Sequence, residues 1–592
     1  MGDILFTRPM DVASGWQIFA RTSAFQLAIL DTPSPYRVDA AQFGDIAVAV
    51  LSNDVEAAEI LDMVRLNREL FVDGLRLRWP AAGIIWNTRS GEFCVFRDIF
   101  GFIVWGVSRI QRELACTTSP DAFAGIVRGR PLNDARMAAY LLETEDNSRA
   151  DFFEHTERIL PGECLFWADS IDGFIDSILG NTKDAQAYEP RAHHVSYWKR
   201  RNYGVFDATY DELVPELRQQ LMDAAGRIGA GEDVCFTLSG GLDSSGILAA
   251  YCAIRKNENK KFDAVSLVSR EHPECDESSE LSVLEAALPI QLKRVNMDAA
   301  WPVSRPESYE SFGAWGPPYA PGIETSLAAY EAVERDLGTR TIITGHGGNL
   351  IVKVRLEAMW RHLLSRMDVR EIAEEIGALT KAHVRYLATR TLANSFDGRL
   401  YTWLNHLRGR NICSVAQRCM KRILLAQFEP AHTDLYFSMS HIQERQQTPQ
   451  TWRWEYIVRS LDRLARQTHH RFYDPLFDPV LYDFCAQIPP QYFMRRGEYR
   501  KLYKDALSPL LPAQILAHPK CKSFSGIIEE GIAKRAIMEI NKRISQFSSE
   551  YIDSKKLLKF YHDYTEETAA GCAHASSMSI WRPLSLCYWK RP

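Results

Sequence analysis

Residues 234–250 read VCFTLSGGLDSSGILAA, and this stretch determines how the C-terminal half of the chain is interpreted. Residues 234–238 form a short apolar, partly β-branched run without a polar face, which is typical of a strand buried on both sides of a parallel sheet. From residue 247 to residue 254 apolar side chains recur at the spacing of one helical face. The stretch therefore predicts a strand, a tight glycine loop and a helix.

The loop in this unit has the properties of a phosphate-binding site. Glycines let the backbone approach a ligand closely, and the unpaired N–H groups at the positive end of the helix dipole attract a phosphate chain. A carboxylate beside phosphates repels them unless a cation lies between, so the aspartate of the loop suggests Mg²⁺. The expected nucleotide-binding residues of the loop are Leu238, Ser239, Gly240, Gly241, Asp243 and Ser244.

The loop is not a Walker A sequence, because it does not end in Gly-Lys-Ser/Thr. The sequence SGGLDSS instead resembles the pyrophosphate loop of the adenylate-forming amidotransferases and synthetases, which include asparagine synthetases and argininosuccinate synthetases. The resemblance implies that the loop holds the pyrophosphate part of ATP while a substrate carboxylate or carbonyl attacks the α-phosphorus. The alternative is a glycine turn of a doubly wound sheet that binds no ligand.

Length and composition indicate a globular protein with two large domains. The chain has 592 residues, of which 46% are hydrophobic and 24% are charged. Its formal net charge is only −5, which does not suggest a nucleic-acid partner.

Cysteine usage and hydropathy point to the cytoplasm. The 12 cysteines form no CxxC pairs, so neither a zinc site nor a secreted disulfide framework is expected. The N-terminal residues lack the apolar core of a signal peptide, and no uncharged apolar run is long enough to span a bilayer. We therefore expect a cytoplasmic protein with reduced thiols and no membrane partner.

The N-terminal half predicts an α+β domain with stacked sheets. One helical stretch is expected over residues 54–71. Short β-rich runs surround it and suggest several strands. These runs lie at residues 17–20, 25–30, 46–51, 83–86, 93–96 and 102–105.

Two local motifs connect this half to the pyrophosphate loop. Residues 97–101, RDIFG, resemble the Arg-Asp-x-x-Gly turn of the glutaminase domain of asparagine synthetases, and residues 158–162, RILPG, resemble the Arg-x-Leu-Pro-Gly segment that leaves that domain. The resemblance implies an N-terminal-nucleophile (Ntn) glutaminase-like domain over residues 1–168.

This domain is expected to have lost its glutaminase chemistry. In the family the nucleophilic cysteine directly follows the initiator methionine, whereas this chain has Gly2 there. Cys94, the first cysteine, lies inside a predicted strand and is expected to be a small core residue. Free glutamine is therefore not expected to be the nitrogen source.

A polar stretch over residues 169–205 is interpreted as the linker, and residues 206–592 as the synthetase domain. His193 and His194 within the linker have no acidic or thiol partner at helical spacing, so a metal site there is disfavoured. A helix over residues 210–228 is expected to lead into the strand of the pyrophosphate loop.

After the loop, strands and helices alternate, which predicts a parallel sheet with the nucleotide at the carboxyl ends of its strands. The resemblance implies an adenine-nucleotide α-hydrolase-like (PP-loop) α/β fold with helical additions. Ser266 and Leu267 resemble the residues that frame adenine in the family. The expected elements are strands at 262–269, 290–295 and 341–344, a helix after Asp276 and a helix at 324–337.

Residues 344–350, TGHGGNL, align with the family segment Ser-Gly-Glu-Gly-Ala-Asp-Glu. Gly345 is expected at the nucleotide. His346 replaces a residue beside the bond-forming centre, where a histidine either takes the proton from an attacking amine or only packs over the nucleotide. Asn349 stands where the second Mg²⁺-binding aspartate is expected; Asp243 is the first, and the amide of Asn349 brings no charge. Leu350 removes another acid, which disfavours the standard pocket for ammonia or a free amino acid.

Residues 517–525, AHPKCKSFS, resemble the family segment Arg-Pro-Lys-x-x-Phe-Ser with one extra residue. The resemblance implies a lysine that contacts the α-phosphate and stabilises the charge of the transition state. Lys520 is favoured for this catalytic role because it follows the proline, and Lys522 is the alternative. Upstream, residues 473–478, YDPLFD, resemble a family element that packs the helical part against the site.

The resemblance as a whole implies ATP-dependent amide formation through an acyl-adenylate, with release of AMP and pyrophosphate and with Mg²⁺ as cofactor. Without an ammonia generator, an amine of the substrate itself is favoured. We therefore favour a lasso-peptide macrolactam synthetase, which implies a precursor (core) peptide, a leader-peptide-processing protease and a leader-binding protein as partners. The alternatives are a β-lactam or other small-molecule amide synthetase, and a catalytically inactive scaffold.

Overall fold

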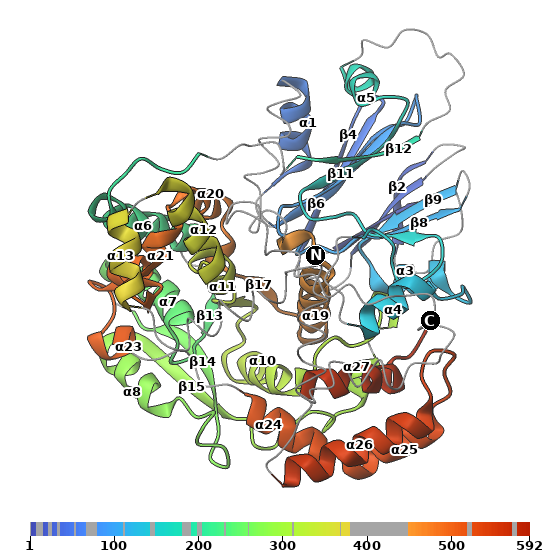
Figure 1. Ribbon diagram of the computed structural model, residues 1–592. Helices are drawn as coiled ribbons and strands as arrows, with labels where there is room; N and C mark the ends of the chain where they lie inside the picture. The colour runs from blue at the N-terminus through green and yellow to red at the C-terminus, as the bar shows by residue number, and fades with distance from the viewer. Residues whose placement is uncertain are drawn as a thin grey trace.

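The computed structural model divides the chain into two stacked sheets at the N-terminal end and a parallel sheet with many helices after it (Figure 1). The structure describes residues 2–7, 16–21, 26–31, 36–52, 55–66, 80–110, 113–142, 148–179, 191–197, 204–229, 233–258, 260–310, 313–367, 369–378, 448–517, 524–570 and 577–592.

The two N-terminal sheets are antiparallel and each has six strands among the described residues. The first has the order β10 (Thr156–Glu157), β8 (Gly106–Ile110), β9 (Glu113–Thr117), β1 (Gly2–Thr7), β3 (Gln26–Asp31) and β2 (Trp16–Arg21). The second has the order β12 (Arg191–Ser196), β11 (Glu163–Ala168), β7 (Phe93–Arg97), β6 (Ala81–Asn87), β5 (Ile46–Ser52) and β4 (Arg37–Phe43).

The second sheet is covered on both faces. Alternate residues of β5 and β6, including Ala49 and Ile84, pack against Ile4 and Phe6 of the first sheet. The other residues, including Val48, pack toward the helices α1 (Ala57–Leu66) and α5 (Ile171–Ile178). This double burial explains why the strand sequence of β5, IAVAVLS, is apolar almost throughout.

One predicted strand is wrong. Residues 102–105 are buried but belong to no strand; β8 begins only at Gly106. The Ile103 carbonyl instead accepts from the side chain of Arg97, at 2.9 Å from Nε, and the Trp105 side chain anchors the segment to β7 by donating from Nε1 to the Phe96 carbonyl at 3.2 Å. A backbone carbonyl of an apolar run thus found its partner in a side chain and not in a ladder. Of the helix expected over residues 54–71, α1 covers Ala57–Leu66, and the residues after it lie outside the described part.

The segment interpreted as a linker, residues 169–205, contains helix α5 and strand β12. Strand β12 pairs along its whole length with β11, from Glu163 opposite Ser196 to Ala168 opposite Arg191. Its polar sequence suggested a linker because β12 is an edge strand, whose outward residues need not be apolar.

The C-terminal sheet is parallel, with the order β15 (Ile290–Asn296), β14 (Phe262–Val268), β13 (Val234–Thr237), β16 (Thr341–Ile343) and β17 (Arg471–Tyr473). The chain runs outward from β13 to β15 and returns to the other side of β13 with β16. The strand order therefore reverses between β13 and β16, which is where ligands bind in doubly wound sheets. The predicted fold class, stacked-sheet α+β followed by a parallel α/β sheet, is confirmed.

Helices cover both faces of the parallel sheet. On one face Val234 and Phe236 join a core that continues into α6 (Tyr210–Gly226) and α7 (Leu242–Ile254). On the other face Cys235 packs with residues of α10 (Ile323–Leu337) and α19 (Trp452–Thr468). Successive side chains of β13 point to opposite faces of the sheet and therefore belong to two separate hydrophobic cores.

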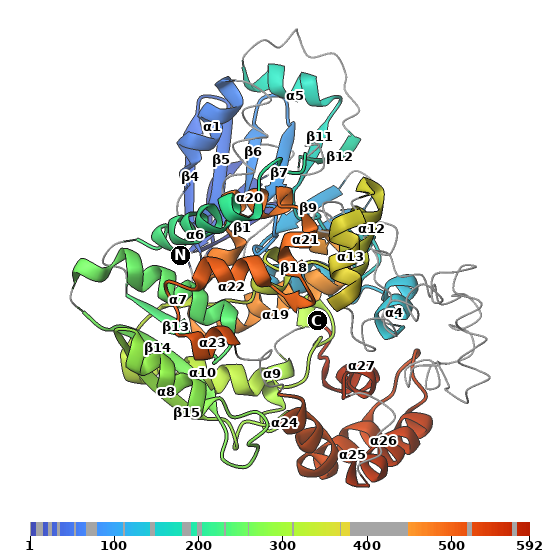
Figure 2. The same ribbon diagram turned by 60° about the vertical axis from the view of Figure 1, so that its left-hand side comes forward.

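Figures 1 and 2 show the other helices of this half. They are α8 (Ser278–Ala287), α9 (Glu307–Glu310), α11 (Gly348–Ile351), α12 (Leu356–Arg366), α13 (Val369–Ala378), α20 (Pro479–Gln487), α21 (Pro490–Phe493), α22 (Lys501–Leu507), α23 (Ala513–Ala517), α24 (Ser525–Glu530), α25 (Ile537–Gln546), α26 (Ser554–Ala569) and α27 (Ser577–Tyr588). Helices α3 (Pro120–Val127) and α4 (Asp134–Leu141) extend the N-terminal half.

Helix α19 stands between the two halves of the molecule (Figure 1) and carries a buried charge network. Glu455 on α19 pairs with Arg97 at 2.9 Å, with Arg459 at 3.0 Å and with Arg158 at 3.6 Å. Arg459 also pairs with Asp151 at 2.6 Å. The two arginines of the RDIFG and RILPG motifs therefore connect the N-terminal half to the synthetase half, a role that no local pattern indicated.

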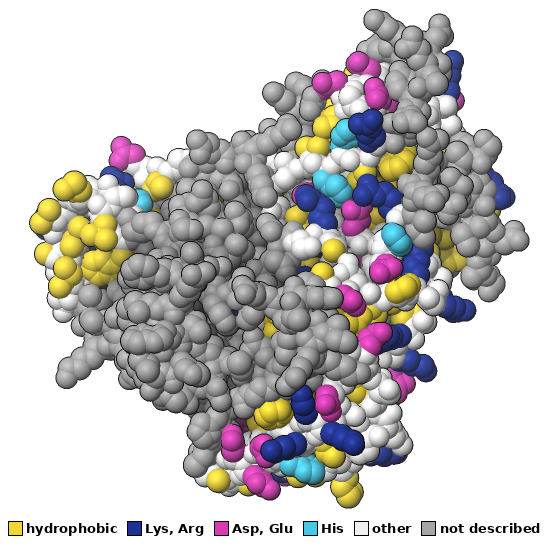
Figure 3. Space-filling model, turned by 45° about the vertical axis from the view of Figure 1, so that its right-hand side comes forward, with side chains coloured by type: hydrophobic (Ala, Val, Ile, Leu, Met, Phe, Trp, Pro, Cys, Tyr) yellow, Lys and Arg dark blue, Asp and Glu magenta, His cyan; other side chains and the backbone are white. Residues whose placement is uncertain are grey.

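An exposed apolar patch lies on the hairpin of α12 and α13. Hydrophobic side chains gather over it at the left edge of Figure 3. The patch consists of Leu364, Met367, Val369 and Ile376, which are 60%, 78%, 74% and 56% exposed. Among the described residues, no helix is long and apolar enough to cross a membrane.

Candidate active site

The loop that follows β13 is organised by its own hydroxyl groups. The Ser239 N–H donates to Ser244 Oγ at 3.1 Å, and the Gly241 N–H donates to Ser239 Oγ at 3.3 Å. Ser245 Oγ donates to the Ser239 carbonyl at 3.1 Å. Leu238 is anchored to the neighbouring strand, since its N–H donates to the Val265 carbonyl at 2.8 Å. The loop is thus already folded as a compact turn at the start of α7.

A glutamate from the next crossover supports this turn. The Glu277 carboxylate accepts a hydrogen bond from the Gly240 N–H at 3.0 Å. Glu277 precedes α8 but its side chain does not cap that helix. A Cβ on Gly240 would lie 2.5 Å from the Cβ of Glu280, so only glycine fits here. Glu277 therefore supports the glycine loop and does not cap the helix that follows it.

Ser266 and Leu267, expected at the adenine, lie on β14 directly beside β13. Ser266 is buried and Leu267 is partly buried. Both lie near the carboxyl end of the strand, on the same edge of the sheet as the glycine loop. The fold therefore brings these residues and the loop to one edge, as a nucleotide that spans adenine to phosphates requires.

The GHGG turn after β16 packs directly on the loop. A Cβ on Gly345 would lie 2.6 Å from the backbone nitrogen of Ser244. Asp474 supports this turn; it follows β17 and lies in the YDPLFD segment, for which the sequence predicted a packing role but no contact with the turn. Its carboxylate accepts from the Gly347 N–H at 2.9 Å, from Thr344 Oγ1 at 3.1 Å and from the Leu476 N–H at 3.0 Å.

Replacing Asp474 is expected to loosen the GHGG turn. Burial raises the pKa of the Asp474 carboxyl to about 7, while hydrogen bonds from the Gly347 and Leu476 N–H groups oppose that rise. The ionised form, which accepts all three hydrogen bonds, therefore predominates above that pH. Asp474→Ala leaves buried donors unsatisfied and should lower the free energy of unfolding by about 1–3 kcal/mol in urea denaturation. The exposed Asp223→Asn is the control, with a change below about 0.5 kcal/mol.

His346 lies in this turn, after the carboxyl end of β16. It is exposed to solvent. Surrounding protein atoms lower the pKa of its imidazole below the ordinary value, and the negative charge of Asp243 acts against this shift. The imidazole is therefore neutral near pH 7, the protonation state that a general base requires.

Asp243 and Asn349, the expected metal ligands, are joined by an arginine. Arg500 Nη1 donates to both carboxylate oxygens of Asp243, at 2.7 and 2.8 Å, and Arg500 Nη2 donates to Asn349 Oδ1 at 3.0 Å. A guanidinium thus fills the position between the two side chains. In this arrangement they do not fit a metal ion, because their oxygens are already committed to a cation.

Sequence reasoning missed Arg500. It precedes α22 and follows the short hairpin of β18 (Met494–Arg495) and β19 (Glu498–Tyr499). The nearby Lys504 pairs with Glu498 at 3.0 Å. No local pattern marks Arg500, since its two partners lie on other elements far away in the sequence.

Lys520 and Lys522, the candidates for the catalytic lysine, lie outside the described residues. The structure therefore leaves both as predictions.

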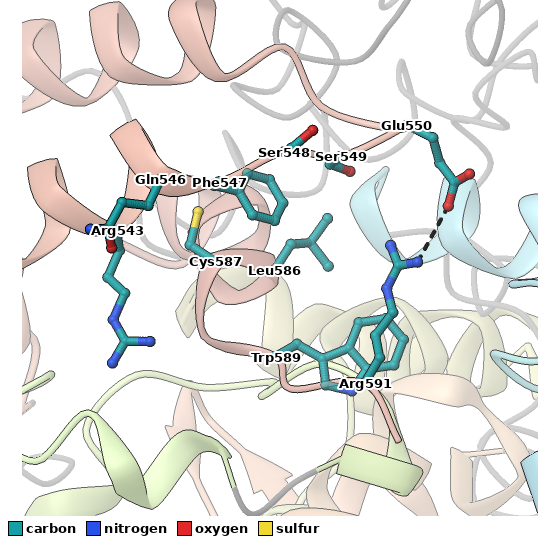
Figure 4. A pocket seen from close by; sticks show the side chains of 10 residues that line it. All are labelled: Arg543, Gln546, Phe547, Ser548, Ser549, Glu550, Leu586, Cys587, Trp589 and Arg591. Atoms are coloured by element: carbon teal, nitrogen blue, oxygen red, sulfur yellow. Dashed lines mark hydrogen bonds and ion pairs between the residues drawn. The ribbon is translucent and has the colours of Figure 1, made fainter. Parts of the chain in front are cut away.

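Two other features, a histidine beside two glutamates and a pocket, lie apart from this edge of the sheet. His194 lies 3.7 Å from Glu157 and 3.8 Å from Glu163, but within the described ranges no group of three His, Cys, Asp or Glu side chains has the geometry to hold a metal. A pocket of about 660 Å³ between α25 and α27 is lined by Arg543, Trp589 and Arg591, and by none of the predicted site residues (Figure 4).

Comparison with known proteins agrees with this geometry. The asparagine synthase family matches residues 216–591, which contain the glycine loop, the GHGG turn and Arg500. The chain belongs to the asparagine synthase family. Membership in this family supports a general activity, ATP-dependent carbon–nitrogen ligation that forms an amide.

Two solved structures are similar to this asparagine synthase family member at a low level. The first is the glutamine phosphoribosylpyrophosphate amidotransferase from B. subtilis complexed with ADP and GMP, with a TM-score of 0.20, 10% identity, and coverage of 59% of this chain and 86% of that chain. The second is described as the allosteric regulatory enzyme of purine biosynthesis, with a TM-score of 0.20, 10% identity, and coverage of 59% and 85%. No curated protein matches the chain.

Proposed function

We propose that this protein closes a macrolactam ring in a peptide, joining the N-terminal amine of a precursor core peptide to an Asp or Glu side chain. The observation that carries the ligase part of this proposal is the geometry of the glycine loop. The glycine loop, the GHGG turn and the residues expected at the adenine, Ser266 and Leu267, lie at one edge of the parallel sheet. This is the edge at which the strand order reverses. This edge suits a nucleotide whose outer phosphates lie in the loop.

The reaction has two steps that balance. A carboxylate oxygen of the peptide attacks the α-phosphorus of ATP, a bond to phosphorus forms and pyrophosphate leaves. The peptide amine then attacks the acyl carbon of the mixed anhydride and the C–N amide bond forms. The acyl C–O bond breaks, and AMP leaves with the bridging oxygen and the electron pair of that bond. His346 accepts the proton that the amine loses, because its imidazole is neutral at the pH of the reaction.

The choice of an intramolecular amine is favoured by a departure in the GHGGNL segment. Leu350 stands where the aligned family segment has an acid, so the standard pocket for ammonia or a free amino acid is disfavoured. The proposal implies a precursor peptide, a leader-peptide-processing protease and a leader-binding protein as partners, and ATP with Mg²⁺ as the nucleotide form supplied.

Purified protein, MgATP and a leader-free core peptide test the proposal. Loss of one water from the peptide together with AMP formation supports ring closure. Two matched peptides serve as controls: one acetylated at the N-terminal amine and one with the acceptor Asp or Glu replaced by Asn or Gln. Neither should cyclise. Turnover only with a small amino-acid derivative favours a β-lactam or other small-molecule amide synthetase, and formation of ADP contradicts an acyl-adenylate.

An inactive scaffold is the second candidate, favoured by one observation. Arg500 ties Asp243 to Asn349, so the loop is closed by a charge pair. Pyrophosphate exchange into ATP in the presence of the core peptide excludes this candidate, since a scaffold makes no adenylate.

His346→Gln is expected to slow amide formation by roughly a hundredfold while leaving pyrophosphate exchange nearly unchanged, because the base acts only in the second step. In the wild-type protein the lowered pKa of His346 places the acidic fall of the rate below the ordinary histidine value of 6.5. The rate should stay constant down to that value, fall at lower pH, and lose this fall in His346→Gln. Equal loss in both steps would contradict a role as base.

A further inference from the structure

The side chains of Asp243, Asn349 and Arg500 form one closed unit at the mouth of the glycine loop. Both carboxylate oxygens of Asp243 and the amide oxygen of Asn349 accept from the same guanidinium, at 2.7, 2.8 and 3.0 Å. The Arg500 and Asp243 side chains are only 15% and 21% exposed. The planar fork of an arginine matches this set of oxygens, whereas a lysine offers one point charge.

The backbone holds Arg500 in place. It has a positive φ of 58°, which is uncommon outside glycine and is typical of functionally constrained residues. The turn of its hairpin, at Arg496 and Gly497, donates two N–H groups to the buried carboxylate of Glu375, at 2.5 and 3.4 Å. The guanidinium is therefore supplied by a braced segment and not by a free loop.

Packing beyond the hairpin keeps Arg500 close to the glycine loop. Helix α22 begins directly after Arg500 and lies against α7. A Cβ on Gly246 of α7 would be 2.8 Å from the Tyr503 hydroxyl and 2.7 Å from Leu507 Cδ1. This close approach sets the distance between the start of α22 and the start of α7.

Gly348 lets the Asp243 carboxylate take this position. A Cβ on Gly348 would lie 2.1 Å from the Asp243 carboxyl carbon, which real Cβ atoms do not tolerate. Gly348 and Asn349 are neighbours at the start of α11. One small residue and one neutral residue thus provide space and an acceptor for the guanidinium.

The charge at this position is balanced without a metal ion. Asp243 contributes one negative charge, Asn349 none and Arg500 one positive charge. A divalent cation is bound mainly by anionic oxygens, and a guanidinium in contact with them repels it. Within the described residues no cluster of three His, Cys, Asp or Glu offers a replacement site.

We propose that Arg500 takes the place of a metal ion at the mouth of the loop, so that the bound nucleotide carries a single divalent cation. The inference rests on the proposed function in that it assumes a nucleotide in the loop. The guanidinium then faces the outer phosphates, to which it is able to donate in pairs. Asp243 orients Arg500 and does not coordinate the metal.

Counting Mn²⁺ by electron paramagnetic resonance tests this proposal. With α,β-methylene-ATP, which resists cleavage, the wild-type protein should hold one Mn²⁺ per bound nucleotide. Without nucleotide it should bind Mn²⁺ at least about tenfold more weakly than the double variant Asn349→Asp/Arg500→Ala, in which two carboxylates face each other without a cation. The double variant should hold two Mn²⁺ per nucleotide.

Two further variants keep the outcome decisive. Arg500→Lys keeps a charge without the fork and should bind Mn²⁺ as weakly as wild type without nucleotide. Arg495→Ala is the matched control, since the Arg495 guanidinium stacks at 4.6 Å on the Tyr210 ring and not on the loop; it should behave as wild type. Far-UV circular dichroism checks that each variant is folded.

Two Mn²⁺ per nucleotide in the wild-type protein, or nucleotide-free Mn²⁺ binding equal to that of the double variant, overturns the proposal. Equilibrium dialysis of the nucleotide separates this failure from failure of the proposed function. If no nucleotide binds, the proposed function fails, while the nucleotide-free comparison of Mn²⁺ affinities still decides the role of Arg500.

Discussion

Asp243→Ala should reduce ATP–pyrophosphate exchange by about a hundredfold to a thousandfold, as is usual when one preorganised charged group at a reacting phosphate is lost. Asp243 is the residue that aims Arg500, through two hydrogen bonds of 2.7 and 2.8 Å. Without the carboxylate, the guanidinium is free to turn away from the phosphates. The measurement is exchange of labelled pyrophosphate into ATP in the presence of the core peptide.

Asp233→Ala is the matched control for this prediction. Asp233 directly precedes β13 and is exposed, so it lies at the opposite end of the strand from the glycine loop. Its removal should leave exchange within about twofold of wild type, since substitutions at exposed positions change stability by about 0.5 kcal/mol or less. Wild-type exchange in Asp243→Ala would mean that the phosphates lie elsewhere.

Glu455→Ala should destabilise the protein by about 3–5 kcal/mol, the usual effect of removing one partner from a buried ion pair. Glu455 is completely buried and faces Arg97, Arg158 and Arg459. Burial acts to raise the pKa of this carboxyl, but the charges of the arginines outweigh it and bring the pKa to about 2. Removal leaves three buried positive charges without their common partner. Urea denaturation and limited proteolysis measure the loss of stability.

The pH dependence of this contact has a defined sign. Because the pKa of Glu455 is lower in the folded protein than its ordinary value of 4.5, its contribution is complete above pH 4.5 and is lost as the pH falls toward about 2. The Glu455→Ala variant should lack this part of the acid transition. Glu331→Ala removes a surface pair with Arg305, whose side chains are 43% and 44% exposed, and should cost less than about 1 kcal/mol.

Local sequence patterns predicted the strands β13, β14, β15 and β16 of the parallel sheet but not its edge strand β17, Arg471–Tyr473. The predicted strand at 290–295 is β15, Ile290–Asn296, and the predicted helix at 324–337 is α10, Ile323–Leu337. Such elements can be predicted from sequence because hydrophobic periodicity and turn residues depend only on neighbouring positions. The strand predicted at residues 102–105 was wrong, because the Ile103 carbonyl accepts a hydrogen bond from the side chain of Arg97, at the end of β7, and not from a neighbouring strand.

The candidate site divides in the same way. The sequence alone determined the glycine loop, the turn that contains His346 and the edge of the sheet on which both lie, because strand, loop and helix follow one another in the chain. Only the tertiary structure decided that Asp474 supports the turn and that Arg500 lies between Asp243 and Asn349. These contacts join residues more than a hundred positions apart. They arise from the packing of separate elements, and a pattern of neighbouring residues does not predict which distant elements pack together.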